Sequence, residues 1–187
     1  MKEHILPAIK LTLVFLVLFS GVYTLVIWGI AQAAGNHGRG FVISHGDKTY
    51  YENIAQNFSS DKYFWSRPSA VNYNAAGAGG SNKGPGNPDY LKEVQARIDT
   101  FLVHNPGIER KDIPSELITA SGSGLDPDIS VKSALIQVNR ISRARSLANP
   151  LIEHIIAECT QKPLMGLFGT EKVNVLKLNI ALDNLKK

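Results

Sequence analysis

The chain has 187 residues, of which 44% are hydrophobic, and a formal net charge of +4. Its Lys and Arg residues are interleaved with Asp and Glu rather than massed in a block, which argues against nucleic acid as a partner. The single cysteine, Cys159, excludes an internal disulfide and a cysteine-based metal cluster. We expect its thiol to be a small buried hydrophobe rather than a nucleophile. Length and composition leave room for one domain of about 150 residues with its own core.

The first element is an uncharged segment that runs from Leu11 to Ala34. As a helix it would be about 36 Å long, enough to cross a hydrocarbon core of about 30 Å. A cleaved signal peptide is the alternative, because Ala31-Gln32-Ala33 has the small residues of a cleavage site. The apolar run is, however, longer than the usual signal core of about 7 to 15 residues. The sequence therefore predicts one uncleaved transmembrane helix, with its ends at Leu11 and Ala34.

The charges beside this helix predict its orientation. Lys2 and Lys10, against Glu3, give a slight positive excess before the apolar segment. Because positive flanks stay in the cytoplasm, residues 1–10 are expected to form a short cytoplasmic N-terminus. A flexible link at residues 35–40 would then lead to an extracytoplasmic domain at residues 41–187.

The domain is expected to open with a small hairpin between Phe41 and Tyr51, where two short apolar runs flank a polar turn. Three adjacent aromatic residues follow, Tyr63-Phe64-Trp65, which could grip a ligand or cover a core. We favour the core, with Arg67 as the side chain that reaches outward. The glycine-rich stretch at residues 74–87 matches neither nucleotide-binding fingerprint and is expected to be a structured surface loop.

A helix is predicted from Asn87-Pro88, because Asn caps a helix and Pro suits its first position. Its apolar residues recur at helical spacing until Asn105-Pro106-Gly107 ends the pattern. Residues 113–119 are expected to form a short strand. That strand would deliver the chain into a loop at residues 118–130.

The loop at residues 118–130 contains the motif most suggestive of an enzyme. Ser121 and Ser123 lie among glycines, as a nucleophile could, but the pattern Gly-x-Ser-x-Gly is not met. The histidines of the sequence occupy no catalytic or metal-binding motif. A serine hydrolase stays open as an alternative. The preferred interpretation is a rigid turn, shaped by Asp126 and capped by Ser130 before the next helix.

An amphipathic pattern follows from Val131 to Ala148. Its polar side carries a row of mostly basic residues: Gln137, Arg140, Arg143 and Arg145. Such a row is usually a solvated face or a set of partners for nearby carboxylates. A docking role is the alternative.

Two further elements complete the chain. Asn149-Pro150 predicts the start of another amphipathic helix. Val173-Asn174-Val175 alternates and then loses its alternation through Leu182, which predicts a strand passing into a short helix. The sum is an α/β (α+β) domain of few strands and about three main helices, preceded by one N-terminal transmembrane helix.

An ordered set of short motifs resembles the C subunit of the Kdp-type potassium-transporting ATPase. The motifs cover almost the whole chain, in order and at similar spacings. They are Gln56-Asn57-Phe58, Tyr63-Phe64, Arg67-Pro68-Ser69-Ala70, Tyr73-Asn74, Gly79-Gly80-Ser81-Asn82, Asn87-Pro88, Thr119-Ala120-Ser121, Gly124-Leu125-Asp126, Gln137, Arg140, Ala144-Arg145, Val173-Asn174, Leu176, Leu178-Asn179 and Ala181-Leu182-Asp183.

The resemblance implies an accessory subunit of a bacterial potassium pump, not an enzyme by itself. Its implied partners are a potassium-channel-like subunit, a P-type ATPase subunit, a further small membrane subunit and the lipid bilayer of the inner membrane. ATP, magnesium and potassium are implied only at the level of the complex, with none bound directly. The family is associated with assembly and with a raised ATP affinity of the hydrolytic subunit.

No catalytic, cofactor-binding or metal-binding residue is expected. The residues expected to serve structure or subunit docking are Tyr63, Phe64, Arg67, Gly80, Ser81, Asn82, Ser121, Gly124, Asp126, Gln137, Arg140 and Arg145. The alternatives are an anchored hydrolase that uses Ser121 or Ser123, and an anchored module that binds a ligand at Tyr63 to Trp65.

Overall fold

A computed structural model describes residues 2–185. Met1 and residues 186–187, at the outer ends of the expected N-terminus and domain, lie outside the described part. The chain forms two compact units that divide between Val42 and Ile43.

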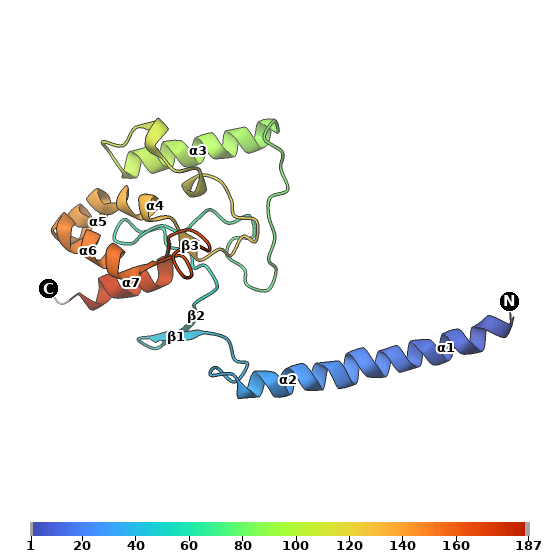
Figure 1. Ribbon diagram of the computed structural model, residues 1–187. Helices are drawn as coiled ribbons and strands as arrows, with labels where there is room; N and C mark the ends of the chain where they lie inside the picture. Colours follow the sequence, from blue (N-terminus) through green and yellow to red (C-terminus); the bar gives the residue numbers. More distant parts are fainter. Residues whose placement is uncertain (1, 186–187) are drawn as a thin grey trace. The chain divides into compact units, whose positions relative to one another are not determined.

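The N-terminal unit is dominated by one long helix. It consists of α1 (Lys2–Leu16), a π-helical stretch η1 (Val17–Tyr23) and α2 (Thr24–Ala33), which follow one another without a break (Figure 1). Its part from Glu3 to Ala33 has a mean hydropathy of 2.3 in its most apolar window. Within the described residues, it is the one helix long and apolar enough to cross a membrane. The helix begins before Leu11, where the uncharged segment starts.

The side chains of this helix are unusual for a water-exposed surface. Leu25 is 66% exposed and Trp28 is 61% exposed, and the other large apolar residues of the helix are exposed as well. The hydroxyl of Thr24, the first residue of α2, donates to the carbonyl oxygen of Phe19 in the π-helical stretch at 3.1 Å. Exposed apolar side chains all around a helix with internally paired backbone are what a bilayer stabilises.

The second unit contains two small sheets. β1 (Val42–His45) and β2 (Lys48–Tyr51) form a two-stranded sheet, as the hairpin prediction expected. The other sheet has the order β3-β5-β4, from β3 (Asp128–Ile129), β5 (Lys172–Asn174) and β4 (Thr160–Gln161). Both of its pairings are antiparallel, with Ile129 and Thr160 opposite Val173 on the central strand.

Helices make up most of the ordered backbone of this unit. They are α3 (Pro88–His104), the 3₁₀ turns η2 (Arg110–Asp112) and η3 (Ser115–Leu117), α4 (Val131–Leu135), α5 (Val138–Arg145), α6 (Asn149–Cys159) and α7 (Val175–Asn184). The mixed α/β class is confirmed. Asn87 caps α3 through its side-chain oxygen, which accepts from the N–H groups of Asp89 and Tyr90, and Ser130 caps α4 in the same way.

The apolar side chains form two separate cores. The larger joins α4 to α7 and the three-stranded sheet, with Ile141, Ile152 and Leu178 fully buried. The smaller lies under α3, where Phe101 packs with Leu117 of η3. Figure 1 shows α3 apart from the orange and red helices.

Three predicted elements differ from the structure. Residues 113–119 were expected to be a strand, but the carbonyl oxygen of Ser115 accepts from the N–H groups of Ile118 and Thr119, so the chain forms a turn. The expected loop at residues 118–130 ends in strand β3. The helix expected to start with Asn149 as cap is instead preceded by Ala148, and the Asn149 side chain donates to Asn139.

The amphipathic pattern after Val131 is also not one helix. It is split into α4 and α5 at Gln137, whose side-chain amide donates to the carbonyl oxygen of Ser133 at 2.9 Å. The backbone N–H of Gln137, which would bond this oxygen in a continuous helix, donates to Ala134 instead. The side chain has thus taken the place of a helical hydrogen bond.

Candidate functional site

The segment from Tyr63 to Ser66 lies between the two cores. Phe64 is completely buried in the larger core, whereas Trp65 packs edge-on against Phe101 of the smaller core, with ring centroids 6.2 Å apart. Successive side chains of an extended segment point to opposite sides. One short segment therefore joins the two halves of the domain.

Side-chain amides hold the backbone of this segment in place of a neighbouring strand. Asn179 of α7 accepts from the Phe64 N–H at 2.8 Å and donates to the Phe64 carbonyl oxygen at 3.0 Å. Gln137 accepts from the Trp65 N–H at 2.8 Å. Both amides are buried, so these bonds satisfy groups that water does not reach.

Arg140 completes this network from α5. Its guanidinium donates to the carbonyl oxygen of Tyr63 at 3.0 Å, to Asn105 at 3.1 Å and to Gln137 at 2.6 Å, and it lies 4.3 Å from the centroid of the Trp65 ring. Burial lowers the pKa of Arg140 to about 10, an effect that the carboxylate of Asp61 opposes. The group remains charged at neutral pH and is only 3% exposed.

The expected basic row is therefore not a surface. Gln137 and Arg140 are buried, and Arg143 is exposed. The helical spacing contains the reason: Gln137 lies three residues after Ala134 and four before Ile141, on the apolar face rather than opposite it. Gln137 and Arg140 are enclosed within the domain, which favours the structural interpretation of these two residues, and a docking role for them stays an untested prediction.

Arg145 lies at the edge of the same region. Its guanidinium donates to Asp183 at 2.6 Å and to the carbonyl oxygen of Lys62 at 2.6 Å, and stacks 4.8 Å from the Tyr63 ring centroid. Tyr63 also donates to Asp183, at 3.1 Å. Burial, followed by this carboxylate, raises the pKa of Tyr63. Arg145 and Tyr63 thus tie α5 to the C-terminal helix.

The loop at residues 118–130 is docked against an earlier loop through backbone hydrogen bonds. The Gly79 N–H donates to the Ser123 carbonyl oxygen at 2.7 Å, and the Ser121 N–H donates to the Pro68 carbonyl oxygen at 3.2 Å. Such pairs need close approach of two backbones.

Glycines permit this approach at two positions. A Cβ on Gly124, whose φ is +69°, would lie 2.6 Å from Val71 Cγ2 and 2.8 Å from the Gly79 carbonyl oxygen. A Cβ on Gly80 would lie 3.0 Å from the carbonyl oxygen of Gly122. Glycine is the residue that fits both places.

Charged groups brace the same loop from both ends. Arg67 was expected to reach outward, but it donates to Asp126 at 2.7 Å and is half-buried. Glu116 accepts from the N–H of Ser130 at 2.9 Å and from the hydroxyl of Ser133. Burial raises the pKa of Glu116, but these hydrogen bonds and the charge of Arg67 outweigh it, so the pKa is lowered overall.

The remaining predicted positions lie in the glycine-rich loop. Ser81 is half-buried and Asn82 is exposed, with a φ of 53°. Lys83, the one cation of the loop, is paired with Glu93 at 2.5 Å. The loop at residues 74–87 therefore does not offer a free lysine to a phosphate.

The serine hydrolase alternative has no geometric support. Ser121 is buried, and the Ser123 hydroxyl accepts from the N–H of Leu125 at 3.1 Å. In the described part of the chain, no histidine is hydrogen-bonded to either hydroxyl. The same part contains no group of three His, Cys, Asp or Glu side chains that could hold a metal ion.

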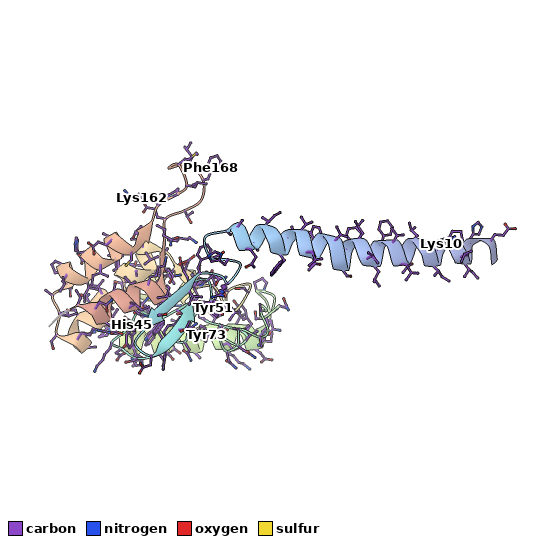
Figure 2. All side chains as sticks on the ribbon, turned by 90° about the horizontal axis from the view of Figure 1, so that it is seen from below. Lys10, His45, Tyr51, Tyr73, Lys162 and Phe168 are labelled. Carbon is purple, nitrogen blue, oxygen red and sulfur yellow. The ribbon has the colours of Figure 1, made fainter. Side chains whose placement is uncertain are left out.

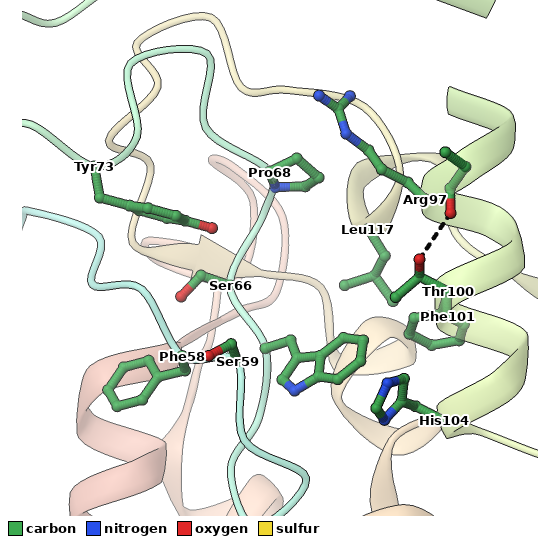
Figure 3. Close-up of a pocket in the computed structure, with 12 residues that line it drawn as sticks. Phe58, Ser59, Ser66, Pro68, Tyr73, Arg97, Thr100, Phe101, His104 and Leu117 are labelled. Carbon is green, nitrogen blue, oxygen red and sulfur yellow. Dashed lines mark hydrogen bonds between the residues drawn. The ribbon is translucent and has the colours of Figure 1, made fainter. Parts of the chain in front are cut away.

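One open cleft lies beside Trp65, in the segment for which ligand binding was left open as an alternative. It has a volume of about 390 Å³ and lies between α3 and the segment around Trp65. Figure 3 shows Tyr73 and Pro68 on one wall and Phe101 and His104 of α3 on the other. The Tyr73 hydroxyl donates to the Arg67 carbonyl oxygen at 2.8 Å, and burial raises its pKa. The aromatic lining of the cleft suits an apolar group.

The long apolar helix and the α/β domain with its internally bonded polar side chains indicate a membrane-associated protein. The family model "K+-transporting ATPase, c chain" matches residues 5–184. The chain belongs to this family, KdpC, and is thus a subunit of a potassium-transporting ATPase rather than an enzyme by itself.

Curated relatives agree over nearly the full length. Proteins named Potassium-transporting ATPase KdpC subunit are 53% identical in Bacteroides fragilis, where the match covers 98% of each chain, and 50% identical in Bacteroides thetaiotaomicron, where it covers 98% of this chain and 100% of the relative. The protein of that name from Caldanaerobacter subterraneus is 40% identical, with 100% of this chain and 98% of the relative covered.

Proposed function

We propose that this chain is the non-hydrolytic accessory subunit that stabilises the assembly of a potassium-channel-like subunit and a P-type ATPase subunit. The observation that carries the proposal is the family match over residues 5–184 together with one membrane-length apolar helix. A small further membrane subunit completes the set of partners.

The proposed topology places the N-terminus in the cytoplasm of a bacterial cell and the α/β domain outside it. Lys2 and Lys10 before the apolar segment support this orientation. An introduced cysteine tests it: Val103 is 77% exposed on α3, so Val103→Cys in a Cys159→Ala chain gives one accessible thiol. A membrane-impermeant maleimide should label intact spheroplasts. Labelling only after lysis would overturn the orientation.

The proposed effect on ATP affinity acts through the membrane-embedded subunits. A domain outside the cytoplasm does not meet a cytoplasmic nucleotide, and the glycine-rich loop has its lysine paired with Glu93. Magnesium, ATP and potassium accordingly belong to the other subunits of the complex.

The test is co-purification of the pump after mild detergent extraction, with and without this chain. Loss of the other subunits' association, or a raised KM for ATP at unchanged kcat, is expected when the chain is absent. Replacing residues 11–34 by an unrelated apolar span of equal length separates the contribution of the helix from that of the domain. Full association and normal ATP kinetics without the chain would refute the proposal.

A second candidate function, ligand binding, rests on the cleft of about 390 Å³ beside Trp65. This volume lies in the range of small-molecule sites. Ala96→Trp should fill the cleft and abolish saturable binding of an apolar probe dye by the full chain in detergent. Val103→Trp, on the same helix outside the cleft, is the matched control. Equal binding by both variants would exclude the cleft.

A further inference from the structure

The loop between β4 and β5 carries a cluster of large apolar side chains at its end. We call residues 163–169 the apolar tip. Leu164 is 70% exposed, Met165 84%, Leu167 81% and Phe168 66%. Figure 2 shows the loop with Lys162 and Phe168 projecting from the rest of the domain. Single exposed apolar residues are ordinary on a protein surface, but four in one short loop mark an interaction site.

The backbone of the apolar tip is largely paired within itself. The N–H of Leu164 donates to the Phe168 carbonyl oxygen at 2.9 Å, and the N–H of Phe168 donates back to Leu164 at 3.0 Å. The N–H groups of Gly166 and Leu167 also donate within the loop, at 2.9 and 3.1 Å. An apolar environment penalises unpaired backbone groups, so this pairing lowers the cost of leaving water.

Charge is arranged around the apolar tip rather than within it. Residues 163–169 contain no charged side chain; Lys162 immediately precedes them, and the exposed carboxylate of Glu171 follows two residues after them. Lys162 is exposed and has no ion-pair partner among residues 2–185, whereas Lys172 on the returning strand is paired with Asp128 at 2.5 Å. A lysine beside exposed Leu, Met and Phe side chains is the composition that suits a bilayer interface with its phosphate groups.

The anchor brings a bilayer within reach of the domain. The helix ends at Ala33, and eight residues, 34–41, precede strand β1. At no more than about 3.6 Å per residue, these span at most about 29 Å. The domain is therefore confined near the membrane surface, and its effective concentration there is high even for a weak contact.

We propose that the apolar tip inserts into the interfacial region of the bilayer that the N-terminal helix spans. Leu167 and Phe168 would enter the boundary between headgroups and acyl chains, and Lys162 would contact lipid phosphate. The domain is thereby held at two points, the anchor and the tip. This inference does not depend on which side of the membrane the domain occupies.

The test uses the full chain alone in phosphatidylcholine vesicles that contain a minor fraction of phosphatidylglycerol. In a Cys159→Ala background, Leu167→Cys is labelled with the environment-sensitive dye NBD, and Val103→Cys is labelled as the matched exposed position. NBD at 167 should be several-fold brighter than NBD at 103 and should be quenched by nitroxide lipids. Adding Phe168→Asp should reduce both effects without changing the circular dichroism of the chain.

Two results would overturn the proposal. In one, NBD at 167 matches the emission and quenching of NBD at 103 in vesicles that hold this chain alone. In the other, NBD at 167 becomes shielded only when the other pump subunits are reconstituted with it. The second result would assign the apolar tip to a recess on a partner protein.

Discussion

Gly124 offers the sharpest test of how the loop at residues 118–130 is held. Its φ of +69° lies in the left-handed region, where Ala costs about 1–2 kcal/mol more than Gly. The new Cβ would also lie 2.6 Å from Val71 Cγ2 and 2.8 Å from the Gly79 carbonyl oxygen. Overpacking of this kind costs about 1–3 kcal/mol. Gly124→Ala should therefore destabilise the domain by about 2–5 kcal/mol.

Gly122 provides the matched control two residues earlier. No heavy atom lies within 4 Å of a Cβ built there. Gly122→Ala should change the free energy of unfolding by less than about 1 kcal/mol. For a domain of this size, the difference between the two variants amounts to a shift in Tm on the order of 10 °C.

The assay is thermal unfolding of the full chain in detergent, and unfolding is monitored through the reaction of Cys159 with a fluorogenic maleimide. Cys159 is the single thiol and is half-buried against the larger core, and burial raises its pKa, so its reaction should become faster when the core opens. Coincident transitions for Gly124→Ala and Gly122→Ala would refute the steric argument. It would then follow that the loop at residues 118–130 and the loop containing Gly79 move apart to admit the new Cβ without a measurable loss of stability.

Three further predictions concern the buried polar network; the first two use the same assay, and the third, which extends to acid pH, is followed by circular dichroism. Asn179→Ala should cost about 2–5 kcal/mol, because it leaves both backbone groups of Phe64 buried and unpaired, and stability equal to wild type would contradict the amide bridge. Arg140→Met should destabilise the domain by about 2–4 kcal/mol, because it removes the hydrogen bonds of a buried guanidinium. Arg143→Met, on the exposed side of the same helix, should cost less than about 0.5 kcal/mol. Equal losses for the two variants would show that burial of the guanidinium does not decide its contribution to stability. Glu116→Gln should destabilise the domain at pH 7. Because the pKa of Glu116 is lowered in the folded state, its ionised carboxylate stabilises the domain above the unfolded-state pKa of about 4.5, and this stabilisation is lost as pH falls through the folded-state pKa. The difference in stability between Glu116→Gln and wild type should therefore disappear in acid. A difference that stays constant with pH would refute this reasoning.

Local sequence rules were sufficient where the deciding contacts are local. Asn87 and Ser130 cap helices because their side chains reach N–H groups two or three residues ahead. The passage from strand into helix after Val173 was predicted from the loss of apolar alternation, and the structure adds Asn174 as the cap that accepts from the N–H of Lys177. Each of these features depends only on residues a few positions away in the sequence.

Residues 113–119 show the limit of this reasoning. The apolar pattern allowed a strand, but a strand needs a partner. The structure instead satisfies the carbonyl oxygen of Ser115 through Ile118 and Thr119. Only the position of the rest of the fold decides whether a partner edge is available.

Asn179 was missed as a site residue, although a signal was present. It lies on the apolar face of its helix, one turn after Val175 and three residues before Leu182, all of them buried. A lone amide on a buried face must have a polar partner. The partner, Phe64, lies 115 positions away in sequence, so no local pattern identifies it.

By itself the sequence determined the long apolar helix, the caps at Asn87 and Ser130 and the family, because each depends on composition, short spacing or ordered motifs. The tertiary structure decided the fate of the basic row. Gln137 and Arg140 became the internal supports of the segment around Trp65 because distant carbonyl and amide groups meet them there. Burial of a polar group depends on which chain segment packs over it. For Gln137 that segment contains Trp65, which is more than 70 residues away in sequence.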